Sequence, residues 1–129
     1  MAELDYAFVA DHAQVAGGKL SAMGASFTHV SVNNADGIFV MSVAGRVRLT
    51  VGEPAPELGI RLRAPEGVFE VENTVQLDLG EDARPYGDKV GVLFASGMAI
   101  PVIPGLFEIY LALNGVEVRR LAFDMVIDD

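Results

Sequence analysis

Apolar and polar residues alternate with a period of two over residues 104–127 of this chain. This is the pattern of β-strands that bury one face and expose the other. Asn114-Gly115 interrupts the alternation, and this dipeptide is the strongest local signal for a hairpin, because a type I′ turn needs positive φ at both central residues. The pattern therefore predicts two antiparallel strands joined by a tight turn.

The alternation slips by one residue in the returning strand, at Arg119-Arg120. One extra residue there restores the buried face, so we predict a β-bulge with both arginines turned outward. The predicted register pairs are Val116–Leu113, Val118–Leu111, Leu121–Ile109 and Phe123–Phe107.

The rest of the chain is also extended, and apolar spacing of three and four residues never persists for the length of a helix. In the first segment, residues 5–15, Tyr6, Phe8 and Val9 are predicted core residues. About eight strands at regular spacing are typical of a sandwich or barrel. We predict one all-β domain over residues 1–129, an antiparallel β-sandwich that is immunoglobulin-like or jelly-roll-like. The further extended segments are residues 19–32, 39–51, 58–63, 69–79 and 90–103.

Two segments are apolar on both strand faces, residues 39–43 and 92–103. The second is therefore expected to be a central strand. In a two-layer sandwich one face of each strand normally meets solvent, so the second apolar face needs a cover. We predict an interface with another protein or with copies of this chain, and the alternative is that loops such as 80–89 fold over this face. The predicted interface residues are Ile38, Val40, Leu93, Ala99 and Ile103.

Composition narrows the class of partner. The chain has 129 residues, 51% of them apolar, no cysteine and a net charge of −9. An acidic surface disfavours binding to nucleic acid unless Arg46, Arg48, Arg61 and Arg63 gather in one patch. No apolar run is long enough for a membrane helix, and the first residues show no secretory signal, so we expect a cytoplasmic protein without a membrane partner.

The two ends of the chain show a resemblance to a known family. The phrase D-Y-A-x-V-A-D-x-A-x-V-x-x-G-K-L over residues 5–20 and the phrase P-G-L-F-E-I-Y-L-A-L-N-G-V-E-V over residues 104–118 resemble a family of small bacterial β-sandwich proteins of unknown function. The resemblance implies a β-sandwich fold and no particular activity. True immunoglobulin hallmarks are missing, because the chain has neither a cysteine pair nor a tryptophan.

Candidate catalytic groups are sparse. Gly17-Gly18-Lys19 lacks the earlier glycine and the following serine or threonine of a phosphate loop, and Ser26 lacks the second glycine of a nucleophile elbow. Asp11, His12 and His29 supply oxygen and nitrogen ligands for a metal-assisted hydrolase, but no tight spacing brings them together.

Carboxylates offer two further sites. Glu70 and Glu72 share one strand face at about 7 Å, a separation compatible with a glycosidase, although the solvent face of a strand carries charge in any case. Glu81, Asp82 and Asp88 in loop 80–89 are oxygen ligands of the kind that calcium binds.

These observations favour a non-enzymatic structural or interaction module that works as an oligomer or as a subunit of a larger assembly, with no catalytic residue, cofactor or metal. The alternatives are a calcium- or carbohydrate-binding module using loop 80–89, and a metal-assisted hydrolase.

Overall fold

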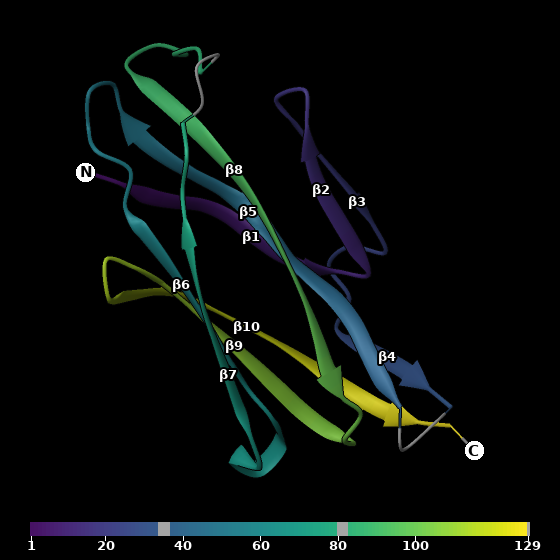
Figure 1. Cartoon of the computed structure of the whole chain (residues 1–129). Helices are drawn as coiled ribbons and strands as arrows, with labels where there is room; N and C mark the ends of the chain where they lie inside the picture. Colours follow the sequence, from purple (N-terminus) through teal and green to yellow (C-terminus); the bar gives the residue numbers. More distant parts are fainter. Residues whose placement is uncertain (34–36, 80–82, 129) are drawn as a thin grey trace.

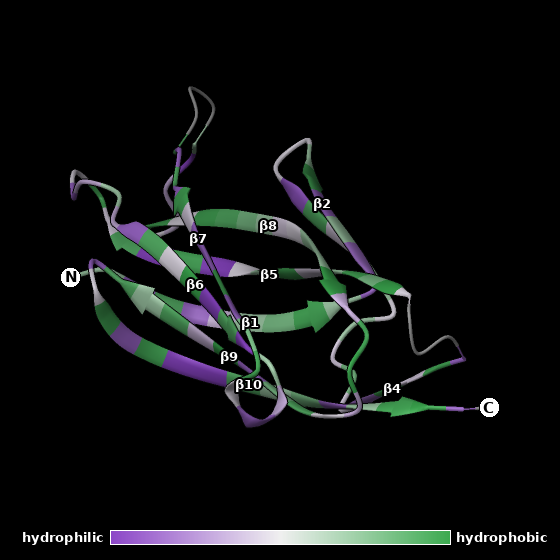
Figure 2. Ribbon diagram, turned by 60° about the horizontal axis from the view of Figure 1, so that its bottom comes forward, coloured by the Kyte–Doolittle hydropathy of each residue, from purple (hydrophilic) through white to green (hydrophobic). Residues whose placement is uncertain are grey.

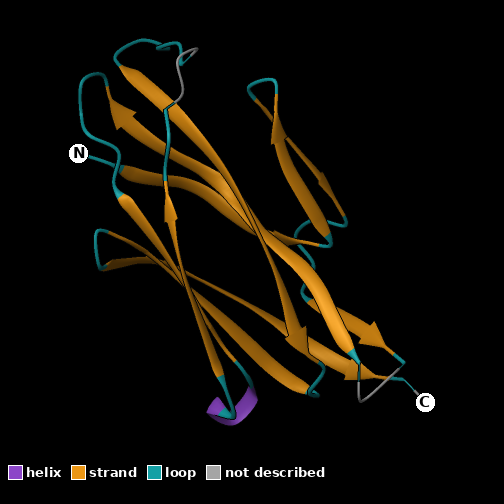
Figure 3. Cartoon of the chain, in the orientation of Figure 1, coloured by secondary structure: helices purple, strands orange, loops and turns teal. Residues whose placement is uncertain are grey.

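The computed structural model describes residues 1–33, 37–79 and 83–128. Within these ranges the regular secondary structure is almost entirely β-strand, and one short 3₁₀-helix, η1 (Pro65–Gly67), joins two of the strands (Figure 3). The prediction of an all-β fold is therefore confirmed. The strands are β1 (Glu3–Ala10), β2 (His12–Ala16), β3 (Lys19–Met23), β4 (His29–Val32), β5 (Ile38–Thr50), β6 (Glu57–Arg63), β7 (Glu70–Gln76), β8 (Lys89–Pro101), β9 (Gly105–Leu113) and β10 (Val116–Ile127).

The strands form two packed sheets and a separate hairpin (Figure 1). The first sheet has the order β1-β5-β8 and the second has the order β4-β10-β9-β6-β7, while β2 and β3 pair only with each other in the described chain. All strand pairs are antiparallel except β4 and β10, which run parallel. The predicted β-sandwich is thus present, with one parallel pair that the alternation did not reveal.

The core lies between the inner faces of the two sheets. Phe107 of β9 and Phe123 of β10 stack face to face with ring centroids 5.2 Å apart, and Phe27 meets Phe123 edge-on at 5.3 Å. Met41 of β5 and Ile100 of β8 close the core from the three-stranded sheet, and both are fully buried.

The closing hairpin follows the predicted turn. Asn114 and Gly115 have φ of 50° and 82°, as a type I′ turn requires. The bulge is present but one residue earlier than predicted, because Glu117 pairs with Ala112 and the next pair is Arg119 with Leu111. Val118 is therefore the extra residue, and the predicted pair Val118–Leu111 is wrong. The pairs Val116–Leu113, Leu121–Ile109 and Phe123–Phe107 are confirmed.

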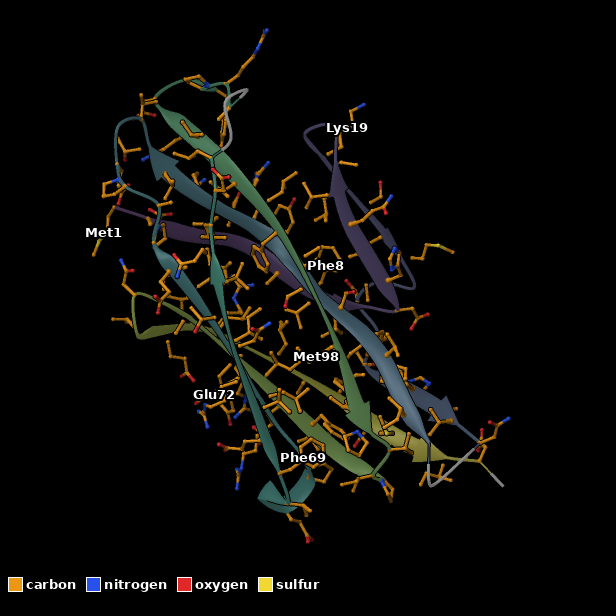
Figure 4. All side chains as sticks on the ribbon, viewed as in Figure 1. Met1, Phe8, Lys19, Phe69, Glu72 and Met98 are labelled. Carbon is orange, nitrogen blue, oxygen red and sulfur yellow. The ribbon has the colours of Figure 1, made fainter. Side chains whose placement is uncertain are left out.

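The first predicted strand is two strands. The chain turns at Asp11, whose backbone N–H donates to the carbonyl of Met23, and β2 then leaves the sheet of β1 to pair with β3. Val9 lies in the main core as predicted, but Tyr6 and Phe8 lie on the outer face of the sheet. Phe8 packs there with Ala13 of the hairpin and Ala44 of β5 (Figure 4).

Strand β8 is an edge strand and not the central strand that its sequence predicted. Within the described residues it pairs with β5 alone. Its inner face is buried by the facing sheet, and β2 packs across part of its outer face, where Ala95 meets the small apolar cluster of the hairpin. The hairpin packed on the outer face of β8 thus covers apolar side chains, although β8 has no second neighbouring strand in the described chain.

Candidate interaction surface

The outer face of the three-stranded sheet is open at one end. Val40 of β5 pairs directly with Ala99 of β8, and Ile38 pairs with Pro101. The exposed fractions of Ile38 and Val40 are 62% and 63%, and Ala99 and Pro101 are exposed as well. We call these four residues the β5–β8 strip.

Two features of the fold leave the strip open. Strand β1 ends at Ala10, which pairs with Ser42, so it stops short of the strip. The β2–β3 hairpin packs at the level of Ala44 and Ala95, further along the same face. Four apolar residues at one end of the sheet consequently meet solvent.

Three of the five predicted interface residues belong to this strip: Ile38, Val40 and Ala99. Leu93 lies apart from them, beside the hairpin, and Ile103 is partly buried against the main core. Pro101 was not predicted. Its place in the strip depends on the β5–β8 register, which no local sequence signal specifies.

The edge of β8 next to the strip lacks the usual protection against strand pairing. Edge strands are normally guarded by charges, prolines, bulges, short length or a covering loop, and β8 has a lysine and a proline only at its two ends. Strand β1 has Glu3, Asp5 and a bulge, β7 carries two glutamates, and β4 has only 4 residues. Strand β8 runs for 13 residues in unbroken register with β5, with no charge between Lys89 and Pro101. Figure 2 shows the consequence, because β8 is green along most of its length while β6 and β10 are banded with purple.

A groove of about 470 Å³ runs beside the middle of this edge. Residues 93–95 of β8 form one side of it, residues 13–15 of β2 a second, and residues 75–78, at the end of β7 and just beyond it, a third. Its lining mixes the polar side chains of Gln14, Gln76 and Asp78 with apolar ones such as Val15 and Leu93.

The outer face of the five-stranded sheet has the opposite character. Arg61 lies 3.2 Å from Glu70, Arg120 lies 3.0 Å from Glu108, and the Arg61 guanidinium also covers the ring of Tyr110. In Figure 4, Glu72 likewise points away from the three-stranded sheet. A face covered by mutually paired charges is poorly suited to close packing against another protein, because those charges would have to lose water.

The arginines do not form a common patch. Arg46 and Arg48 lie on β5 in one sheet, and Arg61 and Arg63 lie on β6 in the other. Each pair has carboxylate partners, so their charges are locally balanced. The gathering that nucleic-acid binding would require is not found among these four residues.

The Arg46 pair is the best shielded of these ion pairs. Arg46 Nε donates to Asp5 Oδ2 at 2.8 Å, and only 19% of the Asp5 side chain is exposed. This hydrogen bond holds the pKa of the Asp5 carboxyl below its ordinary value. Arg48 lowers the pKa of Glu3 in the same way, and the backbone N–H of Thr50 lowers that of Glu53.

The histidines do not converge. His12 lies opposite Met23 in the hairpin, whereas His29 lies opposite Asp124 in the five-stranded sheet. Among the described residues, no group of three or more histidine and acidic side chains is arranged to hold a metal. Glu70, of the proposed carboxylate pair, is engaged by Arg61.

Loop 80–89 can be followed only in part, since Glu81 and Asp82 lie outside the described residues. Asp88 accepts a hydrogen bond from the Val51 amide through its backbone carbonyl. Tyr86 and Arg84 line a second groove, of about 540 Å³, whose other side includes Arg46 and Leu93. Calcium or carbohydrate binding by this loop stays a prediction.

No family model, curated protein or solved structure matches the chain. The resemblance to small bacterial β-sandwich proteins therefore stays a prediction too. In the part of the chain that the structure describes, no helix is long and apolar enough to cross a membrane.

Proposed function

We propose that this protein is a non-enzymatic interaction module that assembles with copies of itself through the β5–β8 strip. The observation that carries the proposal is the side-by-side exposure of Ile38 and Val40 on an uncovered sheet face. Water contact with such side chains is unfavourable, by about 25 cal/mol for each Å² of apolar surface. A contiguous apolar patch of this kind is a common mark of a protein interface.

The contrast between the two sheets supports the choice of surface. The five-stranded sheet covers its outer face with ion pairs, whereas the strip contains no polar side chain. The core of an interface is depleted in charge relative to the rest of the surface. The strip fits that composition.

Four residues alone are too small for a stable contact. Stable interfaces bury about 800 Å² on each partner. The strip must therefore be the centre of a larger surface, and the uncharged edge of β8 continues it directly.

A pair of matched substitutions tests the proposal. Val40→Lys puts a charge in the strip, and Val116→Lys puts the same charge beside the hairpin turn, where the valine is 66% exposed compared with 63% for Val40. We expect sedimentation velocity to show weakened self-association for Val40→Lys and no change for Val116→Lys.

The reason for the expected difference is the cost of burying a lysine charge without a partner. Both positions are exposed in the single chain, so neither change should lower its stability much. Equal behaviour of the two variants and the natural protein would contradict a role for the strip.

A further inference from the structure

We propose that two copies associate by pairing their β8 strands antiparallel across a two-fold axis, which joins the two three-stranded sheets into one sheet of six. This inference rests on the proposed function and specifies how the self-association is built. The partner at the β8 edge is a second copy of this chain.

The first argument is the backbone of β8. In an antiparallel ladder every second residue of an edge strand points its N–H and C=O groups away from the neighbouring strand. Strand β8 pairs with β5 along its whole 13-residue length, and the other edge meets no strand in the described chain. A long, uncharged edge of this kind is a template for another strand.

The second argument is the contrast with the other edges. The acidic residues of β7 and the acidic, bulged start of β1 discourage pairing, and β4 is too short to support a long ladder. Among the four edges of the two packed sheets, strand addition is therefore favoured at β8, and the strands of the separate hairpin are only 5 residues long. If β8 is the edge that accepts another strand, pairing β8 with β8 of a second copy gives a closed dimer and no continuing fibre.

The third argument is that β8 fits itself. An antiparallel pair of identical strands has two-fold symmetry, so each contact occurs twice. The outward side chains in the middle of β8 are Ala95, Gly97 and Ala99, which are small enough to pack against one another across the two-fold axis. A glycine inside a strand often marks a close approach of another backbone, and the ideal Cβ position at Gly97 has no neighbour closer than 3.9 Å.

The fourth argument is continuity with the strip. The two-fold axis of such a pair is perpendicular to the sheet, so both strips lie on the same face of the six-stranded sheet. Ala99 belongs to the strip and to β8 at once. Pairing at the β8 edge brings Ala99 of the strip against the second copy and sets the two strips on one face, with Ile38 and Val40 one strand further from the contact.

Charge makes the association sensitive to salt. Each copy carries a net charge of −9, so two copies repel each other. The proposed contact contains no charged side chain between Lys89 and Pro101. Added salt screens the long-range repulsion and leaves the contact itself intact, so it should strengthen the dimer.

Single cysteines test the geometry directly, because the natural chain has none. We would place one cysteine at a time at Leu93, Ala95, Gly97 and Ala99, oxidise mildly, and measure the fraction of covalent dimer. A disulfide needs Cα atoms about 4.4–6.8 Å apart. In an antiparallel self-pair only the residue at the two-fold axis meets its own copy, since a residue two positions away lies about 13 Å from its copy.

We expect one sharp maximum between Ala95 and Ala99, and background cross-linking for the control Val116→Cys. Equal cross-linking at all four positions, or none above the control, would overturn the strand pairing. If the protein associates but shows equal or no cross-linking, only the strand pairing is overturned. If the protein stays monomeric, the proposed function is overturned as well.

Hydrogen exchange on the unaltered protein covers the case in which a cysteine variant fails to fold. Pairing predicts that alternate amides of residues 93–99, those pointing away from β5, become protected as protein concentration rises. Exchange at these amides that is independent of concentration, while the protein is associated, would exclude β8 as the contact.

Discussion

At the scale of single residues, the clearest electrostatic feature is the Asp5–Arg46 pair. It joins β1 to β5 through side chains that are partly shielded from water. The hydrogen bond from Arg46 lowers the pKa of Asp5 in the folded state, so folding favours the ionised carboxylate. The pair should therefore contribute stability above the ordinary Asp pKa of 3.8, and lose it as pH falls through the lower folded pKa.

Replacing Asp5 with asparagine tests this account. We expect Asp5→Asn to melt at a lower temperature than the natural protein at pH 7, because Arg46 loses its charged partner. The difference should shrink in acid, once Asp5 of the natural protein is protonated. Thermal melts across the acid range check it, with Glu117→Gln as the control, since the described residues show no ion pair at Glu117. A constant difference at all pH values would contradict a role for the carboxylate charge.

At the scale of elements, the closing hairpin shows what alternation can determine. The turn and the pairs beyond the bulge follow from the phase of the apolar positions. The bulge itself lies at Val118 and not at Arg119-Arg120, because the alternation fixes the phase on either side and leaves the position of the extra residue open by one.

Two deletions separate the bulge from the ladder beyond it. Removing Val118 leaves Arg119 opposite Leu111 and keeps every later pair, so we expect a folded protein with a near-natural melting temperature. Removing Ala122 instead turns Phe123 and Met125, which are 1% and 2% exposed, toward solvent.

Each of these two side chains contributes about 1.5–3 kcal/mol when buried. Their joint loss is a large part of a typical unfolding free energy of about 5–15 kcal/mol. Closing the bulge would keep Phe123 in register only by placing Arg120 opposite Ile109. Circular dichroism melts check both deletions, and equal stability of the two variants would contradict the register.

The N-terminal strands and β8 show where alternation fails. The residues before Asp11 and those after it are both extended, so the sequence pattern does not reveal that β2 leaves the sheet of β1. The double-sided apolar pattern of β8 is typical of a central strand, yet its cover comes from the hairpin and from the facing sheet. The order of strands depends on contacts between distant residues, and periodicity describes only local ones.

At the scale of the whole molecule, the sequence predicted the β-sandwich and the need to cover a second apolar face. It placed Ile38, Val40 and Ala99 on the second, outer face, where they are exposed, because apolar residues on both faces of a strand are visible locally. Leu93 and Ile103 lie away from the strip, since the hairpin neighbours Leu93 and the core partly buries Ile103, and only the folded chain shows this. The sequence could not predict that β8 is an open edge strand, because strand order too is visible only in the folded chain.

The molecule as a whole thus has one charged sheet face and one open apolar end with an unprotected strand edge beside it. The open apolar end and the unprotected strand edge lie together on β5 and β8. Their proximity is the basis for proposing an assembly role.

The molar mass in solution, measured by light scattering as a function of concentration, tests that role most directly. The account predicts a mass that rises from the chain mass of 13.7 kDa toward twice that value between micromolar and high micromolar concentration, and rises sooner in added salt. A mass that stays at 13.7 kDa throughout this range, with and without salt, would contradict it.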